Sequence, residues 1–363
     1  MTKTAPTEKR KIIFAAGGKS TYPRNANALK MLRETFDVVE ITSSAGGYLW
    51  RFPIAALKLI FAKKSGVDAI YLGFMGHPLV FLAKAITKKP VIFDVFISLF
   101  DSICLERKTV GLDSLPGKLI FWLDKTACRL ADVVIVDTAA HARWFSETFS
   151  LPPEKIKVFY ICADADLFRP AAKTERKGEF VMEFHGGFIP LQGVEHIVKA
   201  AKILENRPGI KFRFLGKGMT LETARGLSEK LGLKNVEFIE EFVPIEKVPA
   251  FINESDVALG IFGTVGKTFR VIPNKAFEAL ACGKPLITCQ TAAAGEMLKD
   301  GENALLCRAG DSIDLADKIL KLKNDAGLRR RLAENGLKTF QKFCDFNERK
   351  EQLAAIVLST IKK

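Results

Sequence analysis

Short apolar segments alternate with amphipathic helical segments along almost the whole sequence, and this rhythm is what most restricts the possible folds. Near-continuous apolar strands separated by helices are typical of parallel sheets covered on both faces, so we predict an α/β fold. The expected strands of the first half are residues 11–16, 38–41, 68–73, 90–95, 132–137 and 157–160. Those of the second half are 180–184, 211–215, 236–239, 256–261 and 285–288.

The rhythm is interrupted once, at residues 163–178, where a proline and several charges replace the apolar period. Such a segment is typical of an interdomain linker, and 363 residues suffice for two domains. We therefore predict two doubly wound Rossmann-like domains facing a central cleft, comprising residues 1–165 and 176–344. The last helix, within 345–363, is expected to pack back on the first domain.

Charge and cysteine content limit the function classes. The net charge is +14, but the basic residues are dispersed and no zinc-finger, basic-zipper or aromatic RNA-binding pattern occurs, so we expect no nucleic-acid partner. Phosphorylated small molecules and an anionic membrane surface stay open as partners. Seven scattered cysteines predict a reduced protein without a metal site, and the absence of a signal or membrane-spanning pattern predicts a cytoplasmic location.

Three glycine-bearing turns follow expected strands: Gly17 with Gly18, Gly186 with Gly187, and Gly216. Glycine at the end of a strand lets backbone amides approach a phosphate or a sugar closely. The alternative is that any doubly wound sheet needs small residues there. None of the three turns matches G-x-G-x-x-G and no Walker loop is present, so we expect no bound cofactor.

Residues 269–287, FRVIPNKAFEALACGKPLI, form the most specific segment. Pro273 and Asn274 suit the start of a helix, which would combine free amides with the cation of Lys275 to attract an anion. Glu278, three residues further on the same helix face, could accept hydrogen bonds from two neighbouring hydroxyls. The alternative is an ordinary helix carrying a solvated Lys–Glu pair.

This segment, together with FHGGFIPLQGVEHIVKAAKIL, FLGKG and SDVALGIF, resembles the donor-binding domain of retaining glycosyltransferases of family 4, which have the GT-B fold. The resemblance is strong between about residues 164 and 303. It implies that Glu278 holds the donor ribose and that Gly186 and Gly187 lie near the donor phosphates, and we count Gly216 as a further donor-binding candidate. It also implies that residues 240–243, with Glu241 and Phe242, contact the nucleobase.

The sequence departs from the family pattern where the donor diphosphate binds. Arg270 stands where the first glutamate of the paired-glutamate motif belongs, and Gly187 and Gln192 stand where the family often has arginine and lysine. The phosphate charge must then be met by Lys275, Arg270 and the helix terminus at Asn274. We interpret the chain as a rewired subgroup with a P-N-K-x-x-E motif.

The expected activity is metal-independent transfer of a hexosyl group from a nucleoside-diphosphate sugar, with retention implied by the resemblance. Catalytic roles fall to Lys275 and Glu278, and to Asp94 as a group that orients or deprotonates the acceptor. His77, Gly17 and Gly18 are further candidates on the acceptor side. Asp94 could instead serve as a turn or cap, and His77 as a helix-entry residue.

Residues 48–64 mix aromatic side chains with four bases, which suits shallow insertion at an anionic membrane and a lipid-linked or saccharide acceptor. A buried helix with solvated lysines is the equal alternative. Two rival functions stay open for the whole chain. One is a sugar-nucleotide epimerase, and the other is a catalytically inactive nucleotide-sugar-binding subunit.

Overall fold

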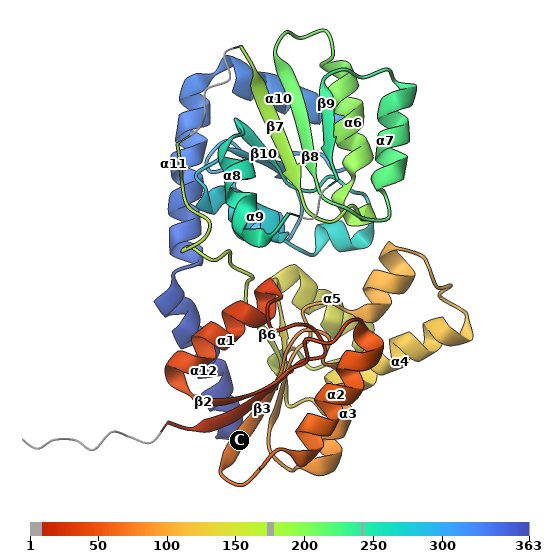
Figure 1. Cartoon of the computed structure of the whole chain (residues 1–363), viewed down its shortest axis with the longest axis vertical. Coiled ribbons are helices and arrows are strands. Elements are labelled where there is room, and N and C mark those ends of the chain that lie inside the picture. Colours follow the sequence, from red (N-terminus) through yellow and green to blue (C-terminus); the bar gives the residue numbers. More distant parts are fainter. Residues whose placement is uncertain (1–8, 173–177, 241–242, 363) are drawn as a thin grey trace, which may run out of the picture. The chain divides into compact units, whose positions relative to one another are not determined.

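The computed structural model describes residues 9–172, 178–240 and 243–362, which divide into two domains. The N-terminal domain contains the chain up to Cys104, Thr109–Tyr160 and the segment from Phe346 onward, and the C-terminal domain contains Leu105–Lys108 and Ile161–Asp345 (Figure 1). The last helix, α12 (Phe346–Ile361), packs against α1 (Pro23–Thr35) in the N-terminal domain.

The N-terminal domain is built on a six-stranded sheet in which every neighbouring pair is parallel. In spatial order the strands are β2 (Asp37–Ile41), β1 (Lys11–Ala15), β3 (Val67–Leu72), β4 (Val91–Asp94), β5 (Val133–Val136) and β6 (Ile156–Val158). Both faces are buried, because Ile13 belongs to one apolar cluster while its neighbours Ile12 and Phe14 belong to another. Alternation of side chains along a strand places them on opposite faces.

Helices cover each face of this sheet. One face carries α2 (Tyr48–Phe61), α3 (His77–Ile86), α4 (Leu115–Leu130) and α5 (Ala139–Phe149), which contact one another in sequence. The other face carries α1 and α12, and α12 contributes Leu353, Ile356 and Val357 to the apolar cluster there. A 3-10 turn, Pro153–Lys155, precedes β6, and a π-helical turn, Asp101–Glu106, extends into the short segment Leu105–Lys108 that belongs to the C-terminal domain.

The C-terminal domain repeats this design with a second six-stranded parallel sheet. Its spatial order is β12 (Leu305–Cys307), β11 (Leu286–Cys289), β10 (Val257–Leu259), β7 (Phe180–His185), β8 (Ile210–Leu215) and β9 (Val236–Ile239). The helices are α6 (Val194–Ile203), α7 (Leu221–Lys230), α8 (Val248–Asn253), α9 (Asn274–Ala281), α10 (Ser312–Asn324) and α11 (Ala326–Phe343), with short 3-10 turns at Pro190–Gln192, Ile245–Lys247, Gly266–Phe269 and Ala294–Glu296. The prediction of two doubly wound α/β domains is therefore confirmed.

The strand order also indicates where a ligand binds in the C-terminal domain. From β7 the chain runs outward through β8 and β9, and then it returns to the other side of β7 to form β10. This reversal is a topological switch point, and open parallel sheets bind ligands beyond the carboxyl ends of the strands there. The carboxyl end of β7 is His185, followed by Gly186.

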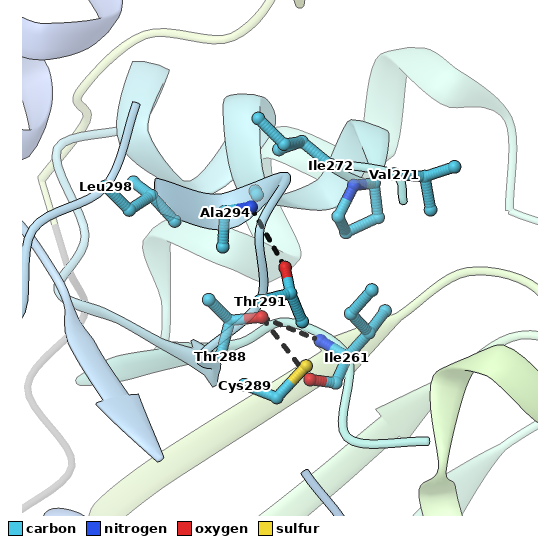
Figure 2. Close-up of a pocket in the computed structure, with 10 residues that line it drawn as sticks. Ile261, Val271, Ile272, Thr288, Cys289, Thr291, Ala294 and Leu298 are labelled. Atoms are coloured by element: carbon cyan, nitrogen blue, oxygen red, sulfur yellow. Dashed lines mark hydrogen bonds between the residues drawn. The ribbon is translucent and has the colours of Figure 1, made fainter. Parts of the chain in front are cut away.

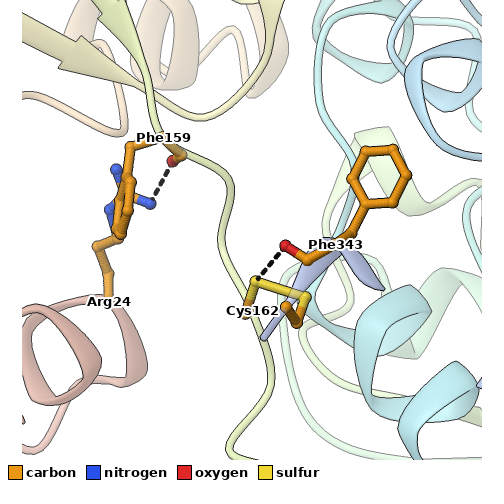
Figure 3. The surroundings of a disulfide bond; sticks show 5 residues. Arg24, Phe159, Cys162 and Phe343 are labelled. Atoms are coloured by element: carbon orange, nitrogen blue, oxygen red, sulfur yellow. Dashed lines mark hydrogen bonds between the residues drawn. A yellow bond between two sulfur atoms is a disulfide. The ribbon is translucent and has the colours of Figure 1, made fainter. Parts of the chain in front are cut away.

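The expectation of fully reduced cysteines is wrong for one pair. Cys162 and Cys344 form a disulfide, with their Cα atoms 5.5 Å apart, although 182 residues separate them in sequence (Figure 3). The bond joins the beginning of the C-terminal domain to its end, since this domain runs from Ile161 to Asp345. A protein kept in a reducing compartment would hold this pair as thiols. The other five cysteines are free and buried.

Candidate active site

Helix α9 forms the centre of the candidate site and begins where the sequence predicts. Pro273 caps it in an extended conformation, and Asn274 is the first helical residue. Gly283 ends the helix with a φ of +62°, and its amide donates to the carbonyl oxygen of Leu280 at 3.0 Å. Glycine is favoured at this position because a left-handed residue follows the helix. The first turn of α9 therefore presents backbone amides and the positive end of the helix dipole.

Lys275, the second residue of α9, is buried instead of solvated. Its ammonium group donates to Oε1 of Gln192 at 2.5 Å and lies 3.4 Å from the centre of the Phe184 ring. Burial lowers the pKa of Lys275 well below its ordinary value, against the opposing charges of Glu183 and Glu278. A buried ammonium with a lowered pKa gains a strong partner when an anion binds beside it.

Glu278 lies on the same helix and is also buried, with an exposed fraction of 7%. Its Oε2 lies 2.7 Å from Nε2 of His185, and Nδ1 of the same ring lies 2.9 Å from Oε2 of Glu183. Lys275 and Glu278 therefore do not form the solvated surface pair that the sequence left open. Each is held by a different partner from outside α9.

The glycine turns around this helix are required by close contacts. Gly186 has a φ of +122°, and a Cβ atom at this position would lie 3.4 Å from Cε of Lys275. Gly216, after β8, has a φ of +144°, and a Cβ there would lie 2.0 Å from the carbonyl oxygen of Gly186. At Gly186 the dihedral angle favours glycine, and at Gly216 both the dihedral angle and the lack of space require it. The two turns thus stack directly on each other beside Lys275.

The positions that depart from the family pattern lie around the same helix. Gly187 is exposed, and a Cβ there would have no neighbour within 4 Å. Arg270 follows the 3-10 turn before α9, where its guanidinium packs so closely on Gly266 that a Cβ there would lie 2.9 Å from Nη1. Lys267, in that turn, pairs with Glu106 at 3.1 Å. Lys275 is therefore the lysine that lies directly beside the Gly186 turn.

A small apolar pocket lies on another side of α9 (Figure 2). Pro273 and Ala276 line it from the helix, and Thr288 bonds through Oγ1 to the backbone amide of Ile261 at 3.2 Å. Thr291 accepts from the amide of Ala294 at 2.9 Å. Neither Lys275 nor Glu278 lines this pocket, and no charged residue is among its ten lining residues. Its chemistry suits an apolar group and not a diphosphate.

The acceptor-side candidates lie in the N-terminal domain, where packing accounts for the glycines. A Cβ on Gly17 would lie 2.3 Å from the carbonyl oxygen of Met75, and one on Gly18 would lie 2.8 Å from the Phe74 ring. His77, at the start of α3, is fully buried, with Nε2 3.1 Å from Oδ1 of Asp124. Gly17 and Gly18 thus allow close packing after β1, and His77 is a buried residue at the start of α3.

Asp94, at the end of β4, has both carboxylate oxygens occupied. Arg24 donates to them from Nε at 2.8 Å and from Nη2 at 3.0 Å, and Tyr71 donates its hydroxyl at 2.8 Å. The third guanidinium nitrogen of Arg24 donates to the carbonyl oxygen of Phe159 at 2.6 Å (Figure 3). Asp94 is 1% exposed. The structure therefore places this carboxylate in a saturated buried network.

Two of the sequence-based site residues, Glu241 and Phe242, lie outside the described residues. Conversely, the sequence analysis assigned no role to His185 or Glu183, which the structure brings to Glu278. A signal was available in the strand itself. A glutamate and a histidine two positions apart inside an apolar strand share one face, so the pattern E-F-H places two buried ionisable groups together.

Solved structures with the same fold cover nearly the whole chain. HepE from Anabaena in complex with UDP gives a TM-score of 0.71 at 17% identity, covering 96% of this chain and all of that one. Sucrose-phosphate synthase from Thermosynechococcus elongatus gives 0.75 at 14% identity, covering 97% of this chain and 99% of that one. At this identity the likeness establishes the fold, which is that of the GT-B glycosyltransferases.

Sequence comparisons add a likeness for the C-terminal domain. Residues 168–339 match the family model described as glycosyl transferases group 1. An uncharacterized glycosyltransferase of Methanocaldococcus jannaschii is 29% identical over 167 residues, 44% of this chain and 43% of its own length. A D-inositol 3-phosphate glycosyltransferase of Acidothermus cellulolyticus is 25% identical over 245 residues, 63% of this chain and 53% of its own length. The chain spans about half the length of the curated relatives it matches.

Proposed function

We propose that the protein is a glycosyltransferase that moves a hexosyl group from a nucleoside-diphosphate sugar to an acceptor, with retention of configuration and without a metal ion. One observation carries the proposal. The buried ammonium of Lys275 and the carboxylate of Glu278 lie on one helix, beside the stacked turns of Gly186 and Gly216. These turns follow β7 and β8, next to the switch point of the group 1 domain.

The arrangement matches what the reaction requires. Departure of a nucleoside diphosphate from the anomeric carbon places growing negative charge on the leaving phosphate. The Lys275 ammonium and the first-turn amides of α9 can stabilise this charge in a site from which water is largely excluded. The free oxygen of Glu278 can accept hydrogen bonds from the ribose hydroxyls. Among the described residues no group of three or more metal-ligating side chains occurs, so the proposed charge stabilisation rests on these groups.

UDP is the first nucleotide to test, because the structural neighbour HepE was solved with UDP and with UDP-glucose. Thermal unfolding should be measured with UDP, GDP, ADP and CDP, and with the corresponding sugars. A ligand at 100 times its Kd adds about 2.7 kcal/mol of stability, which is easily detected. Failure of every nucleoside diphosphate and nucleotide sugar to raise the Tm would refute the proposal.

Donor consumption separates the rival functions. A transferase releases nucleoside diphosphate faster when an acceptor is present, whereas an epimerase converts the donor sugar without any acceptor. An inactive nucleotide-sugar-binding subunit would bind the donor and release no nucleoside diphosphate, alone or with acceptor. We expect acceptor-dependent release, measured by chromatography of the nucleotide pool.

For the acceptor, we propose a lipid-linked or saccharide molecule met at an anionic membrane surface. Two helices of the N-terminal domain, α2 and α4, both contact α3 and expose large apolar side chains. The most exposed are Trp50, Leu57 and Phe61 on α2 and Leu115, Leu119 and Trp122 on α4. The one acidic residue on these two helices, Asp124, is fully buried, whereas Arg51, Lys58, Lys118 and Arg129 are basic.

Exposed apolar side chains bordered by bases favour shallow insertion among anionic headgroups. Within the described residues, none of the helices has both the length and the hydropathy needed to cross a bilayer, so binding would be peripheral. We expect the protein to co-sediment with liposomes that contain phosphatidylglycerol, and not with pure phosphatidylcholine. Replacing Trp50, Phe61 and Trp122 by serine should abolish this binding.

The matched control is Ile313→Ser, which removes a 65% exposed apolar side chain from α10 in the C-terminal domain. This variant should bind liposomes as the wild type does. Equal sedimentation with both lipids, or retention of binding in the triple variant, would argue for the alternative in which α2 only covers the sheet.

A further inference from the structure

We infer that His185 is a positioning residue of the donor site: clamped as an imidazolium between Glu183 and Glu278, it fixes the carboxylate of Glu278 in place for the donor ribose. This inference rests on the proposed function, because it assigns a role in holding the same donor. It concerns a residue on β7 and not the helix that carries Lys275 and Glu278.

The geometry around the ring supports the charged form. Nδ1 lies 2.9 Å from Oε2 of Glu183, and Nε2 lies 2.7 Å from Oε2 of Glu278, so each ring nitrogen faces a carboxylate oxygen. A neutral imidazole carries a single N–H and could donate to only one of them. The protonated ring donates to both, and it places one positive charge between two buried negative charges.

Because all three side chains are buried, the negative charges of the two carboxylates need a positive charge beside them. Glu183 is 1% exposed, His185 5% and Glu278 7%. Two carboxylates buried side by side without a cation would repel each other, and one would take up a proton. Within the described residues, Oε1 of Glu183 is buried without a hydrogen-bond partner. The contact that Glu183 does make, to His185, is therefore the one that accounts for its buried charge.

As a consequence, the two carboxylate oxygens of Glu278 have different roles. Oε2 is held by the imidazolium at 2.7 Å, which restricts rotation of the carboxylate. Oε1 is left for the donor. A ribose that offers two neighbouring hydroxyls needs an anionic acceptor at a fixed position, because a neutral carboxylic acid accepts hydrogen bonds less strongly.

The protonation of His185 determines the pH range over which the ring can hold both carboxylates. Burial alone would lower the pKa of His185, but the charge of Glu183 and the hydrogen bonds to Glu183 and Glu278 outweigh it and raise the pKa from 6.5 to about 9. The other ionisable groups facing the cluster are Lys275, whose pKa burial lowers, and Cys282, whose pKa burial raises to about 12. Because the folded pKa of His185 exceeds the unfolded one, its stabilising effect is complete below pH 6.5 and disappears as the pH rises through about 9.

The test compares the wild type with His185→Gln, Glu183→Gln and the control His196→Gln, which changes a histidine of α6 outside this cluster. UDP affinity is measured by calorimetry between pH 6 and about 10, and the histidine side chains are titrated by NMR. We expect His185→Gln to weaken UDP binding by about 10-fold or more, as loss of a hydrogen bond to a charged group does. His196→Gln should bind UDP as the wild type does.

The NMR titration distinguishes His185 from Lys275, which also loses its proton as the pH rises. The histidine signal that disappears in His185→Gln should titrate near pH 9 in the wild type, and at lower pH in Glu183→Gln. A midpoint near 6.5, or unchanged UDP affinity in His185→Gln, would overturn the inference while the proposed function stands. If no nucleoside diphosphate binds the wild type, both fail. Should His185→Gln not fold, the histidine signal whose midpoint changes between the wild type and Glu183→Gln is assigned to His185, and its wild-type midpoint still decides.

Discussion

Replacing Lys275 by methionine is expected to reduce kcat/KM for sugar transfer by about 100-fold, the usual cost of removing one donor that stabilises developing charge. Methionine is an unbranched side chain like lysine, but it removes the ammonium group that lies over the Phe184 ring. The Tm should not fall, because burial already disfavours the charged form of Lys275 in the folded protein. Loss of activity without loss of stability is the measurement that identifies a donor-binding role.

The structure suggests a second substitution that should restore part of the activity lost in Lys275→Met. The ammonium of Lys275 lies 2.5 Å from the side-chain oxygen of Gln192, so a lysine introduced at position 192 would bring its charge close to the same point. We expect Gln192→Lys to restore part of the activity of Lys275→Met. The control is Lys230→Met, which removes an exposed lysine from the end of α7. Equal donor affinity in Lys275→Met and wild type would exclude Lys275 from the diphosphate site.

The proposed role of Lys275 would account for the departures from the family pattern, because it supplies the positive charge from a different helix. Position 187, where the family often has arginine, is an exposed glycine with open space around it. Position 192 is glutamine, and its side chain is held by the lysine of the neighbouring helix. In the proposed site one cation would therefore come from α9 in place of the 3-10 turn that contains Gln192.

The elements that the sequence predicts best are those defined by local signals. Helix Asn274–Ala281 begins at the residue that the sequence predicts, because Pro273 and Asn274 both favour a helix start. Strand β12 was not predicted, since its three residues carry no period of their own and pair only with β11. The π-helical turn Asp101–Glu106 was also missed, because it lacks a comparable local signal.

In the candidate site, too, local sequence patterns predict some features and miss others. Lys275 and Glu278 could be predicted together because three residues on one helix place them on one face. Their actual partners could not, because Gln192 is 83 residues from Lys275 and His185 is 93 residues from Glu278. Only the parallel pairing of β7 with β10, and the packing of α9 on β10, brings these segments together. The disulfide partners, 182 residues apart, were inaccessible for the same reason.

Replacing Asp94 by asparagine is expected to lower the free energy of unfolding by about 3–5 kcal/mol, the usual cost of removing one partner of a buried ion pair. Asparagine keeps the shape of the side chain, but it leaves the guanidinium of Arg24, whose side chain is 2% exposed, without its counter-charge. Chemical denaturation monitored by circular dichroism measures the loss. The matched control is Asp37→Asn, since Asp37 pairs with Lys11 at 3.1 Å at the surface and its side chain is 56% exposed. Such a pair contributes about 1 kcal/mol or less.

A second substitution tests whether the uncompensated charge causes the loss. Arg24→Met in the Asp94→Asn background removes the buried cation, so the double variant should be more stable than Asp94→Asn alone. An unchanged unfolding free energy in Asp94→Asn would contradict the buried-pair explanation. Normal stability and normal nucleotide binding combined with lost transfer would instead support the acceptor-orienting role that its position at the end of β4 suggests. Because Arg24 and Tyr71 already occupy both carboxylate oxygens, we expect the stability result.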